Sequence, residues 1–323
     1  MRLIAALFAF IALTLPALAR EFRISFPVDC TLGEDCFFLQ NVDADPGPGA
    51  ADFTCNPNSY DGHKGTDIAL TSFSAMAQNI PVLAVAPGKV TATRDGMPDR
   101  ASTPETLADI EGKECGNGVM IDHGGGWTSQ YCHLKSGSVA VQRGQRVPMG
   151  AMLGAIGLSG KTQFPHLHLV LRKNNAVIDP FDAEGVTACG TAGEPTALWL
   201  TPIEYAPTGI VSAGLALGPV THQDAKAGIP PQQSIPENAP ALVGWALLHN
   251  PYPGDLLTIE IRTPAGKVSR NQIEIEKKQV LRTVFAGKKL RANISGPVHL
   301  SIALSRNGAE IESFEADFPV TPE

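Results

Sequence analysis

The sequence Phe164-Pro165-His166-Leu167-His168-Leu169-Val170-Leu171 decides the local fold around the most chemically active side chains of the chain. Its alternating apolar residues predict a strand, and Pro165 disfavours a helix across this stretch. Successive side chains of a strand point to opposite faces, so His166 and His168 share one face, about 7 Å apart. Two imidazoles on one face suit a transition-metal site, although such pairs also occur on solvated faces.

A second segment, Tyr60–Leu70, carries His63 and Asp67. Its two glycines disfavour a helix, so we expect these two side chains to be presented by a turn that enters a strand. Together with His168 they form a set of two histidines and one carboxylate, which binds zinc and leaves a coordination position open for water. The alternative is a structural turn in which the carboxylate of Asp67 caps backbone amides.

A third segment ends in His133, within the sequence Ser129-Gln130-Tyr131-Cys132-His133-Leu134. It reads as a strand that feeds a turn. Cys132 and His133 are neighbours in a strand, so their side chains point to opposite faces. Cys132 is therefore poorly placed as a ligand and suits a structural disulfide.

Taken in order, these motifs resemble those of the lysostaphin-type (LytM-like) zinc metallopeptidases, which are peptidoglycan endopeptidases. The resemblance covers roughly Tyr60 to Pro180. The matching motifs are His63-x-Gly65-x-Asp67, Tyr131-x-His133-Leu134, and Gly157-x-Ser159-Gly160 leading to Pro165-His166-Leu167-His168. The order and number of these motifs make the match specific.

The resemblance implies a role for each matching residue. One Zn²⁺ per chain would be bound by His63, Asp67 and His168, while His133 and His166 would be catalytic without binding the metal. The implied fold is a twisted antiparallel sheet with the metal in a groove across one face. Which of the two catalytic histidines acts as the general base stays open.

The chain also departs from the family pattern. Gln163-Phe164 replace small residues before Pro165, Leu169 stands where an aromatic is common, and Cys132 stands beside His133. The segment Asp95–Glu114 is an unusual insertion. These departures affect the shape of the groove and leave all five implied site residues in place.

The function implied by the resemblance is that of an exported zinc metalloendopeptidase, which hydrolyses peptide bonds of peptidoglycan. One alternative is a catalytically silent module on the same fold that binds the wall or activates an amidase. Such modules usually lack ligands or catalytic histidines. Another alternative is an exported peptidase that acts on protein substrates.

The compartment follows from the N-terminus. Met1–Ala19 reads as a secretory signal peptide, with Arg2, an apolar run and cleavage after Ala19. No later apolar stretch is long enough to span a membrane. The net charge of −7 at pH 7 argues against nucleic acid or anionic lipid as a partner. We therefore expect an exported protein, periplasmic or extracellular.

Composition and periodicity predict a mainly β chain. It holds 32 glycines and 26 prolines but only 18% charged residues, which indicates short strands joined by tight turns. We expect strands at Gly118–Asp122 and Trp127–His133, joined by three glycines. We also expect a hairpin around Pro87-Gly88, formed by Pro81–Ala86 and Lys89–Arg94.

The domain organisation is predicted in four parts after the signal peptide. Residues 20–58 form a cysteine-rich segment packed on the peptidase domain, 59–185 the zinc peptidase domain, and 186–207 a connector. Residues 208–323 contain strands with alternating apolar residues and form a small all-β, sandwich-like domain with a turn at Arg306-Asn307-Gly308. This last domain gathers no catalytic residue types, so we expect metal binding not to need it. It is a candidate surface for a protein partner.

The six cysteines predict three intramolecular disulfides, because an even number in an exported chain favours complete pairing. Pairing Gly118 with Cys132 across their hairpin would bring Cys115 beside Cys132, and the other pairs stay open. Mass spectrometry of the unreduced, alkylated mature protein should find no alkylated cysteine. Any alkylated thiol would contradict this prediction.

Overall fold

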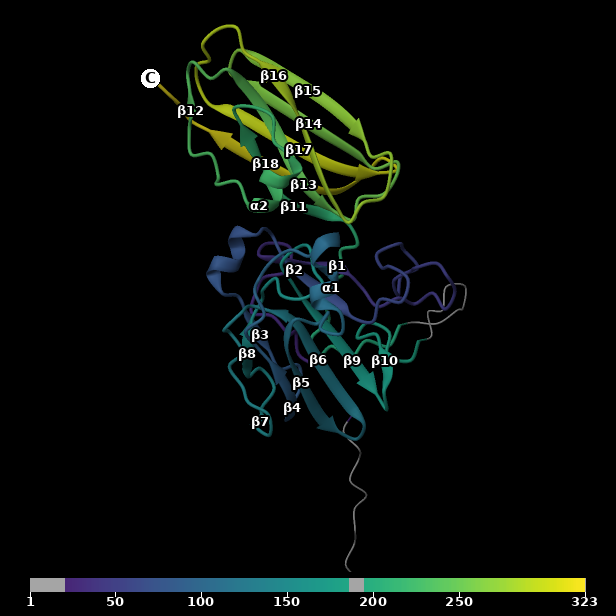
Figure 1. Cartoon of the computed structure of the whole chain (residues 1–323). Helices are drawn as coiled ribbons and strands as arrows, with labels where there is room; N and C mark the ends of the chain where they lie inside the picture. The colour runs from purple at the N-terminus through teal and green to yellow at the C-terminus, as the bar shows by residue number, and fades with distance from the viewer. Residues whose placement is uncertain (1–20, 186–194, 323) are drawn as a thin grey trace, which may run out of the picture.

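The structure, a computed structural model, describes residues 21–185 and 195–322 (Figure 1). The predicted signal peptide and Cys189 lie outside the described residues. The strands fall into two stacked β bodies: those up to Ile178 form the N-terminal body, and those from Gly209 onward form the C-terminal body. This confirms the prediction of a mainly β chain.

The N-terminal body is built on an antiparallel sheet with strand order β1-β2-β9-β6-β5-β4-β7, in which β10 also pairs with β9. A second small sheet pairs β3 with β8. The strands are β1 (Cys36–Gln40), β2 (Thr66–Leu70), β3 (Pro81–Leu83), β4 (Gly88–Arg94), β5 (Asn117–Gly124), β6 (Trp127–Leu134), β7 (Arg146–Val147), β8 (Met152–Ala155), β9 (His166–Lys173) and β10 (Ala176–Ile178). The short helices are η1 (Ser74–Gln78), η2 (Pro104–Thr106) and α1 (Leu107–Ile110).

Strand β9 lies inside this sheet, as its apolar alternation predicts. Leu167, Leu169 and Leu171 are at most 1% exposed and belong to the main core of the N-terminal body. His166 and His168 alternate with them and therefore share the opposite face. The strand predicted from the motif and the common face of its two histidines are both confirmed.

The local pairing was predicted correctly at one hairpin and wrongly at another. β5 and β6 pair across the three glycines, as expected. The hairpin expected around Pro87-Gly88 is wrong, because β3 pairs with β8 while β4 pairs with β5 and β7. Residues 84–86 are buried and connect two different sheets. Local periodicity cannot reveal such a crossing, since it depends on partners far away in the sequence.

The C-terminal body is a sandwich of two antiparallel sheets around an apolar core. The hairpin at Arg306-Asn307-Gly308 is confirmed, with Arg306 opposite Ala309. One sheet has the order β11-β13-β16 and the other β15-β14-β17-β18, with β12 and β19 paired at the side. The elements are β11 (Gly209–Ala216), α2 (His222–Ala227), β12 (Ile235–Pro236), β13 (Ala241–His249), β14 (Leu256–Thr263), β15 (Gly266–Glu274), β16 (Leu281–Lys289), β17 (Val298–Arg306), β18 (Ala309–Phe318) and β19 (Val320–Thr321).

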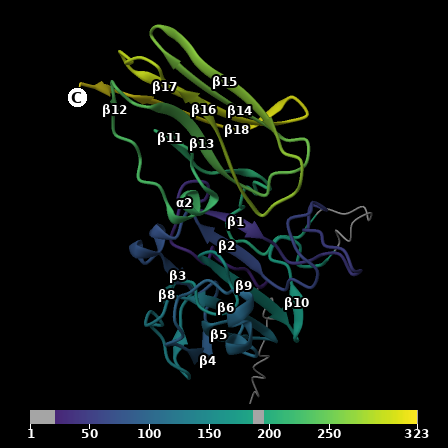
Figure 2. The same cartoon turned by 45° about the horizontal axis from the view of Figure 1, so that its top comes forward.

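The two bodies are joined by a buried apolar cluster, which we call the junction cluster. It consists of Phe37, Leu39, Ala69 and Phe164 from the N-terminal body, with Phe73, Val211 and Leu281 packed against them. Segment α2 lies between the C-terminal sheets and the strands β1 and β2 (Figure 2). The ammonium of Lys226 on α2 lies 5.5 Å from the ring centre of Phe164. The C-terminal body thus packs directly beside the strand that carries Asp67.

Two disulfides are present among the described residues, Cys30–Cys36 and Cys115–Cys132. Cys55 is also disulfide-bonded. The pairing of Cys115 with Cys132 confirms the prediction from the β5–β6 hairpin. It ties the insertion to the strand that carries His133. No helix in the described part of the chain is long and apolar enough to cross a membrane.

Candidate metal centre

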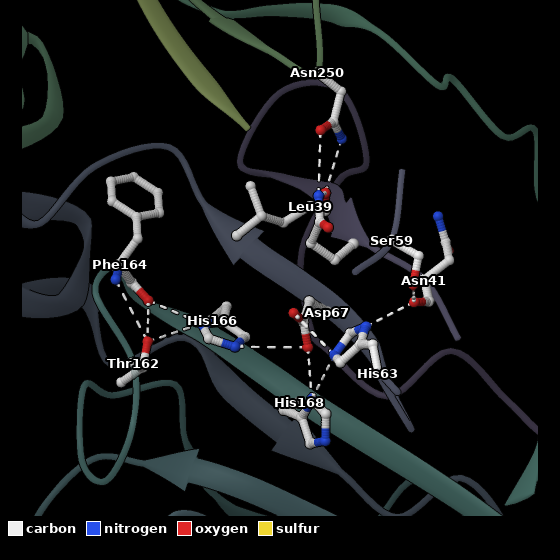
Figure 3. Close-up of polar contacts among 11 residues, drawn as sticks. Leu39, Asn41, Ser59, His63, Asp67, Thr162, Phe164, His166, His168 and Asn250 are labelled. Atoms are coloured by element: carbon white, nitrogen blue, oxygen red, sulfur yellow. Dashed lines mark hydrogen bonds and ion pairs between the residues drawn. The ribbon is translucent and has the colours of Figure 1, made fainter. Parts of the chain in front are cut away.

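Three neighbouring strands bring the predicted site residues together. Asp67 on β2 lies opposite His168 on β9, and His168 lies opposite Cys132 on β6. His63 is presented by the turn that enters β2, as expected from the sequence. Figure 3 shows the side chains of His63, Asp67, His166 and His168 converging on one point of the sheet face.

The donor atoms of His63, Asp67 and His168 have the spacing of a metal site. His63 Nε2 lies 3.2 Å from His168 Nδ1 and 3.4 Å from Asp67 Oδ2, and His168 Nδ1 lies 2.7 Å from Asp67 Oδ1. Ligands held about 2.0–2.1 Å from a tetrahedral zinc ion lie roughly 3.3 Å from one another. The three residues therefore fit a zinc ion with only small adjustments.

A second group shares one member with the first. Among the described residues, two groups of at least three potential ligands have donor atoms within 4.8 Å of one another. They are His63, Asp67 and His168, and His133, His166 and His168. His166 Nε2 is 3.6 Å from Asp67 Oδ1, at the margin of the first group. His133 and His166 therefore lie beside the candidate metal position and face it.

Backbone carbonyls set the tautomers of three of these histidines. A neutral imidazole that donates its Nδ1–H to a carbonyl keeps Nε2 unprotonated and free to accept a proton or bind a metal. In each case Nε2 then faces the site. The contacts are His63 Nδ1 to Asn41 O at 2.6 Å, His133 Nδ1 to Ser159 O at 2.8 Å, and His166 Nδ1 to Phe164 O at 2.9 Å.

The electrostatics of the site centre on Asp67, which is buried. Burial opposes its charge, but His166, His63 and His168 hold the pKa of its carboxyl well below the usual range. Although burial favours neutral His63, the nearby Asp67 raises the pKa of that imidazole in the metal-free protein. Protonation of His63 therefore competes with metal binding to the same imidazole.

His133 and His166 are held in their neutral form. Burial lowers the pKa of His166, and burial together with the neighbouring His166 and His168 lowers the pKa of His133 well below its usual range. Neutral imidazoles with a free Nε2 can accept a proton at neutral pH. This is the protonation state that a general base requires.

The backbone of His133 is unusual and was not expected from the sequence. Its φ of 62° lies in the left-handed region, which a non-glycine residue rarely adopts. Its amide donates to Cys115 O, and its carbonyl accepts from the amide of Gly157. These two contacts, together with the adjacent Cys115–Cys132 disulfide, keep the imidazole aimed at the site.

The insertion Asp95–Glu114 supports the loop that orients His133. Its backbone at Ser102 donates to Thr162 O at 2.7 Å, and the carboxylate of Asp99 accepts from the amide of Leu158 at 2.8 Å. This loop supplies Ser159 O, the acceptor of His133. The carbonyls that orient the histidines were missed by sequence reasoning, because every residue carries one and no side-chain signal marks them.

The close packing around Gly65 explains why the first motif has a glycine at this position. A Cβ at this position would lie 2.5 Å from His168 Cε1, 2.8 Å from His168 Nε2 and 2.8 Å from Leu169 O. Atoms cannot approach that closely, so any side chain here would displace the imidazole. The glycine makes room for a candidate metal ligand.

Comparison with known proteins agrees with this geometry. The model of peptidase family M23 matches residues 61–180. Cell division protein DipM of Caulobacter vibrioides is 38% identical over 64 residues, which are 20% of this chain and 10% of that protein. The DD-carboxypeptidase/endopeptidase Mpg of Neisseria meningitidis is 34% identical over 91 residues, 28% of this chain and 20% of that protein.

A solved structure described as a zinc containing peptidase from Vibrio cholerae is also similar. It is 24% identical, has a TM-score of 0.29, and the match covers 45% of this chain and 39% of that chain. The matched segments span only 10 to 20% of the two curated relatives. Sheet, motifs and site define a β protein with a histidine–carboxylate centre of the metallopeptidase type. The match to peptidase family M23 lies in residues 61–180, the segment that carries all five of these site residues.

Replacing Gly65 with alanine should weaken metal binding. The added methyl group clashes with the His168 imidazole and must displace it. We expect zinc affinity to fall by about 10–100-fold, the scale seen when the support of a metal ligand is lost. Titration with zinc against a coloured chelator measures the effect. Gly218→Ala is the matched control, because a Cβ there meets no atom within 4 Å. Unchanged affinity in folded Gly65→Ala would contradict the steric role.

Proposed function

We propose that this chain is an exported zinc metalloendopeptidase that hydrolyses peptide bonds of peptidoglycan. The observation that carries the proposal is the convergence of His63 Nε2, Asp67 and His168 Nδ1 at ligand spacing, with His133 and His166 facing the same point. The match of residues 61–180 to peptidase family M23 supports the substrate class. Disulfides among the described residues favour an oxidising compartment and hence export.

In this proposal His63, Asp67 and His168 hold the zinc ion. When bound, zinc supplies Lewis-acid chemistry, polarising the scissile carbonyl and lowering the pKa of water. The two imidazoles must be neutral when they bind, and the carbonyl of Asn41 already holds His63 in the tautomer that frees Nε2. Asp67 supplies the negative charge that offsets part of the charge of a divalent ion.

His133 and His166 carry out the proton transfers in this proposal. Each presents an unprotonated Nε2 toward the site, so each can take a proton from the attacking water. Once protonated, the same nitrogen donates a hydrogen bond to the oxyanion that develops on the substrate, or a proton to the leaving amine. Which histidine starts as the base is open, because both have the same tautomer and a lowered pKa.

A catalytically silent module is the second candidate, and the site chemistry disfavours it. Such a module has no need for a buried carboxylate surrounded by imidazoles, which is unfavourable without a compensating cation. Asp67 is 4% exposed and His133 is 6% exposed, so neither is a solvated surface residue. Both fit a functional centre better than a binding surface.

Variants should separate ligands from catalysts. Asp67→Ala and His168→Ala each remove a ligand and should release zinc, because two remaining ligands bind far more weakly. His133→Ala should keep stoichiometric zinc while its rate falls on the order of 10²-fold or more, the usual scale for proton transfer. Elemental analysis of the purified variants distinguishes the two classes.

His166 is the discriminating case within the pair. We expect His166→Ala to keep zinc and lose activity, like His133→Ala. If His166→Ala loses stoichiometric zinc while His168→Ala retains it, the assignment within the pair is reversed. Circular dichroism of each variant confirms that the fold is retained.

The substrate class is tested by digestion of purified peptidoglycan. The mature protein with zinc should release fragments whose new amino and carboxyl ends, identified by mass spectrometry, map to a peptide bond of the wall. His133→Ala is the matched control for contaminating hydrolases. Cleavage of unfolded protein substrates with intact peptidoglycan left untouched would instead favour an exported protein peptidase.

A further inference from the structure

The segment that orients His63 is also held by the C-terminal body. The carbonyl of Asn41 accepts hydrogen bonds from His63 Nδ1 at 2.6 Å and from Ser59 Oγ at 2.8 Å. Asn41 is 1% exposed and follows directly after β1. The position of this one carbonyl therefore sets the direction of His63 Nε2.

Asn58 and Tyr205 hold Asn41 in place. The amide of Asn41 donates to Asn58 O at 2.9 Å, and its side chain donates to Tyr205 Oη at 2.8 Å. Asn58 Nδ2 donates to Tyr205 Oη at 3.1 Å, and Tyr205 in turn donates to Asp52 at 2.8 Å. The group is internally hydrogen-bonded but leaves Asn58 Oδ1 to accept from elsewhere.

Lys278 of the C-terminal body provides that partner. Its Nζ lies 2.6 Å from Asn58 Oδ1, 3.2 Å from Asn250 Oδ1 and 3.4 Å from Asn250 O. An ammonium group has three protons, so these acceptors can use all of them. The ammonium also lies 4.4 Å from the ring centre of Tyr252. The side chain of Lys278 thus links the C-terminal body to Asn58, the residue that holds Asn41.

Asn250 of the C-terminal body provides a second link, to the two residues that precede Asn41. Its Nδ2 donates to Leu39 O at 2.7 Å, and its Oδ1 accepts from Gln40 Nε2 at 3.3 Å (Figure 3). Asn250 is 2% exposed and has a φ of 48°, a strained conformation that asparagine tolerates better than most residues. Leu39 and Gln40 directly precede Asn41, and Gln40 lies opposite Asp67 in the sheet.

The polar contacts of Lys278 and Asn250 are not needed to hold the two bodies together. The junction cluster already joins them through buried apolar side chains. Burial lowers the pKa of Lys278 to about 7, so this position disfavours the charged form of the lysine. Buried polar links add little to net stability compared with apolar packing, and their better-supported use is to select one geometry.

We infer that Lys278 and Asn250 are positioning residues for His63, so that the C-terminal body completes the metal centre without contributing a ligand. This inference rests on the proposed zinc site. The hydrogen-bonded path runs from Lys278 through Asn58 and Asn41 to His63, and Asn250 holds the residues just before Asn41. It departs from the expectation, drawn from sequence, that metal binding does not need residues 208–323.

Lys278→Met in the full chain tests the inference, because it keeps the apolar stem and removes every donated hydrogen bond. We expect zinc to bind about tenfold or more weakly and to pass faster to a competing chelator, the usual effect of losing support around a ligand. Lys288→Met is the matched control. Lys288 lies exposed near the end of β16, and this variant should bind zinc like the unaltered protein.

A second readout needs no metal. In the metal-free protein, the His63 Nδ1 proton is donated to Asn41 O and should give a slowly exchanging NMR signal. Lys278→Met should speed its exchange with water by about tenfold or more, whereas Lys288→Met should not. Asn250→Gly is the second variant, for use if Lys278→Met fails to fold. Glycine tolerates the positive φ and removes the side-chain amide, so this variant should also weaken zinc binding and speed the exchange of the His63 proton.

The inference is overturned if folded Lys278→Met and Asn250→Gly both keep the zinc affinity and the proton exchange of the unaltered protein. The C-terminal body would then pack against the N-terminal body without positioning His63. This result is distinct from failure of the proposed function. In that case the unaltered protein itself would not bind stoichiometric zinc, while the exchange of the His63 proton would still report on the path.

Discussion

The buried carboxylate of Asp67 is the constraint on which the rest of the site depends. A charge removed from water is tolerated only when it is paired and hydrogen-bonded, and Asp67 meets His63, His166 and His168 at short range. These partners come from one turn and one neighbouring strand. A slip of one residue between β2 and β9 would turn Asp67 to the opposite face, so the register of the sheet is part of the chemistry.

Around this centre, the direction of each imidazole is set by backbone carbonyls in loops. Those loops are supported by distant parts of the chain: the insertion supports Ser159, and the N-terminal segment with the C-terminal body supports Asn41. The site lies on a rigid sheet, yet its fine geometry depends on segments that carry no catalytic residue. The insertion Asp95–Glu114, a departure from the family pattern, thus supports the same centre.

The predictable part of the fold was the part governed by local rules. Alternation along β9 placed Leu167 on the face of the main core and the two histidines on the opposite face, and glycines between β5 and β6 marked a true hairpin. The disulfide between Cys115 and Cys132 followed from that hairpin. The expected hairpin around Pro87-Gly88 was wrong because β4 found partners in β5 and β7, and strand partners are chosen by the whole sheet.

By itself, the sequence determined which side chains could take part in the chemistry and which strand face carries His166 and His168. It could do so because residue type and a period of two are local properties. Only the tertiary structure decided that His63 is aimed by Asn41, that His133 adopts a left-handed backbone, and that Lys278 reaches Asn58. Those features depend on carbonyls and contacts between segments far apart in the chain. No residue pattern encodes them, because every residue has a carbonyl and only folding selects its partner.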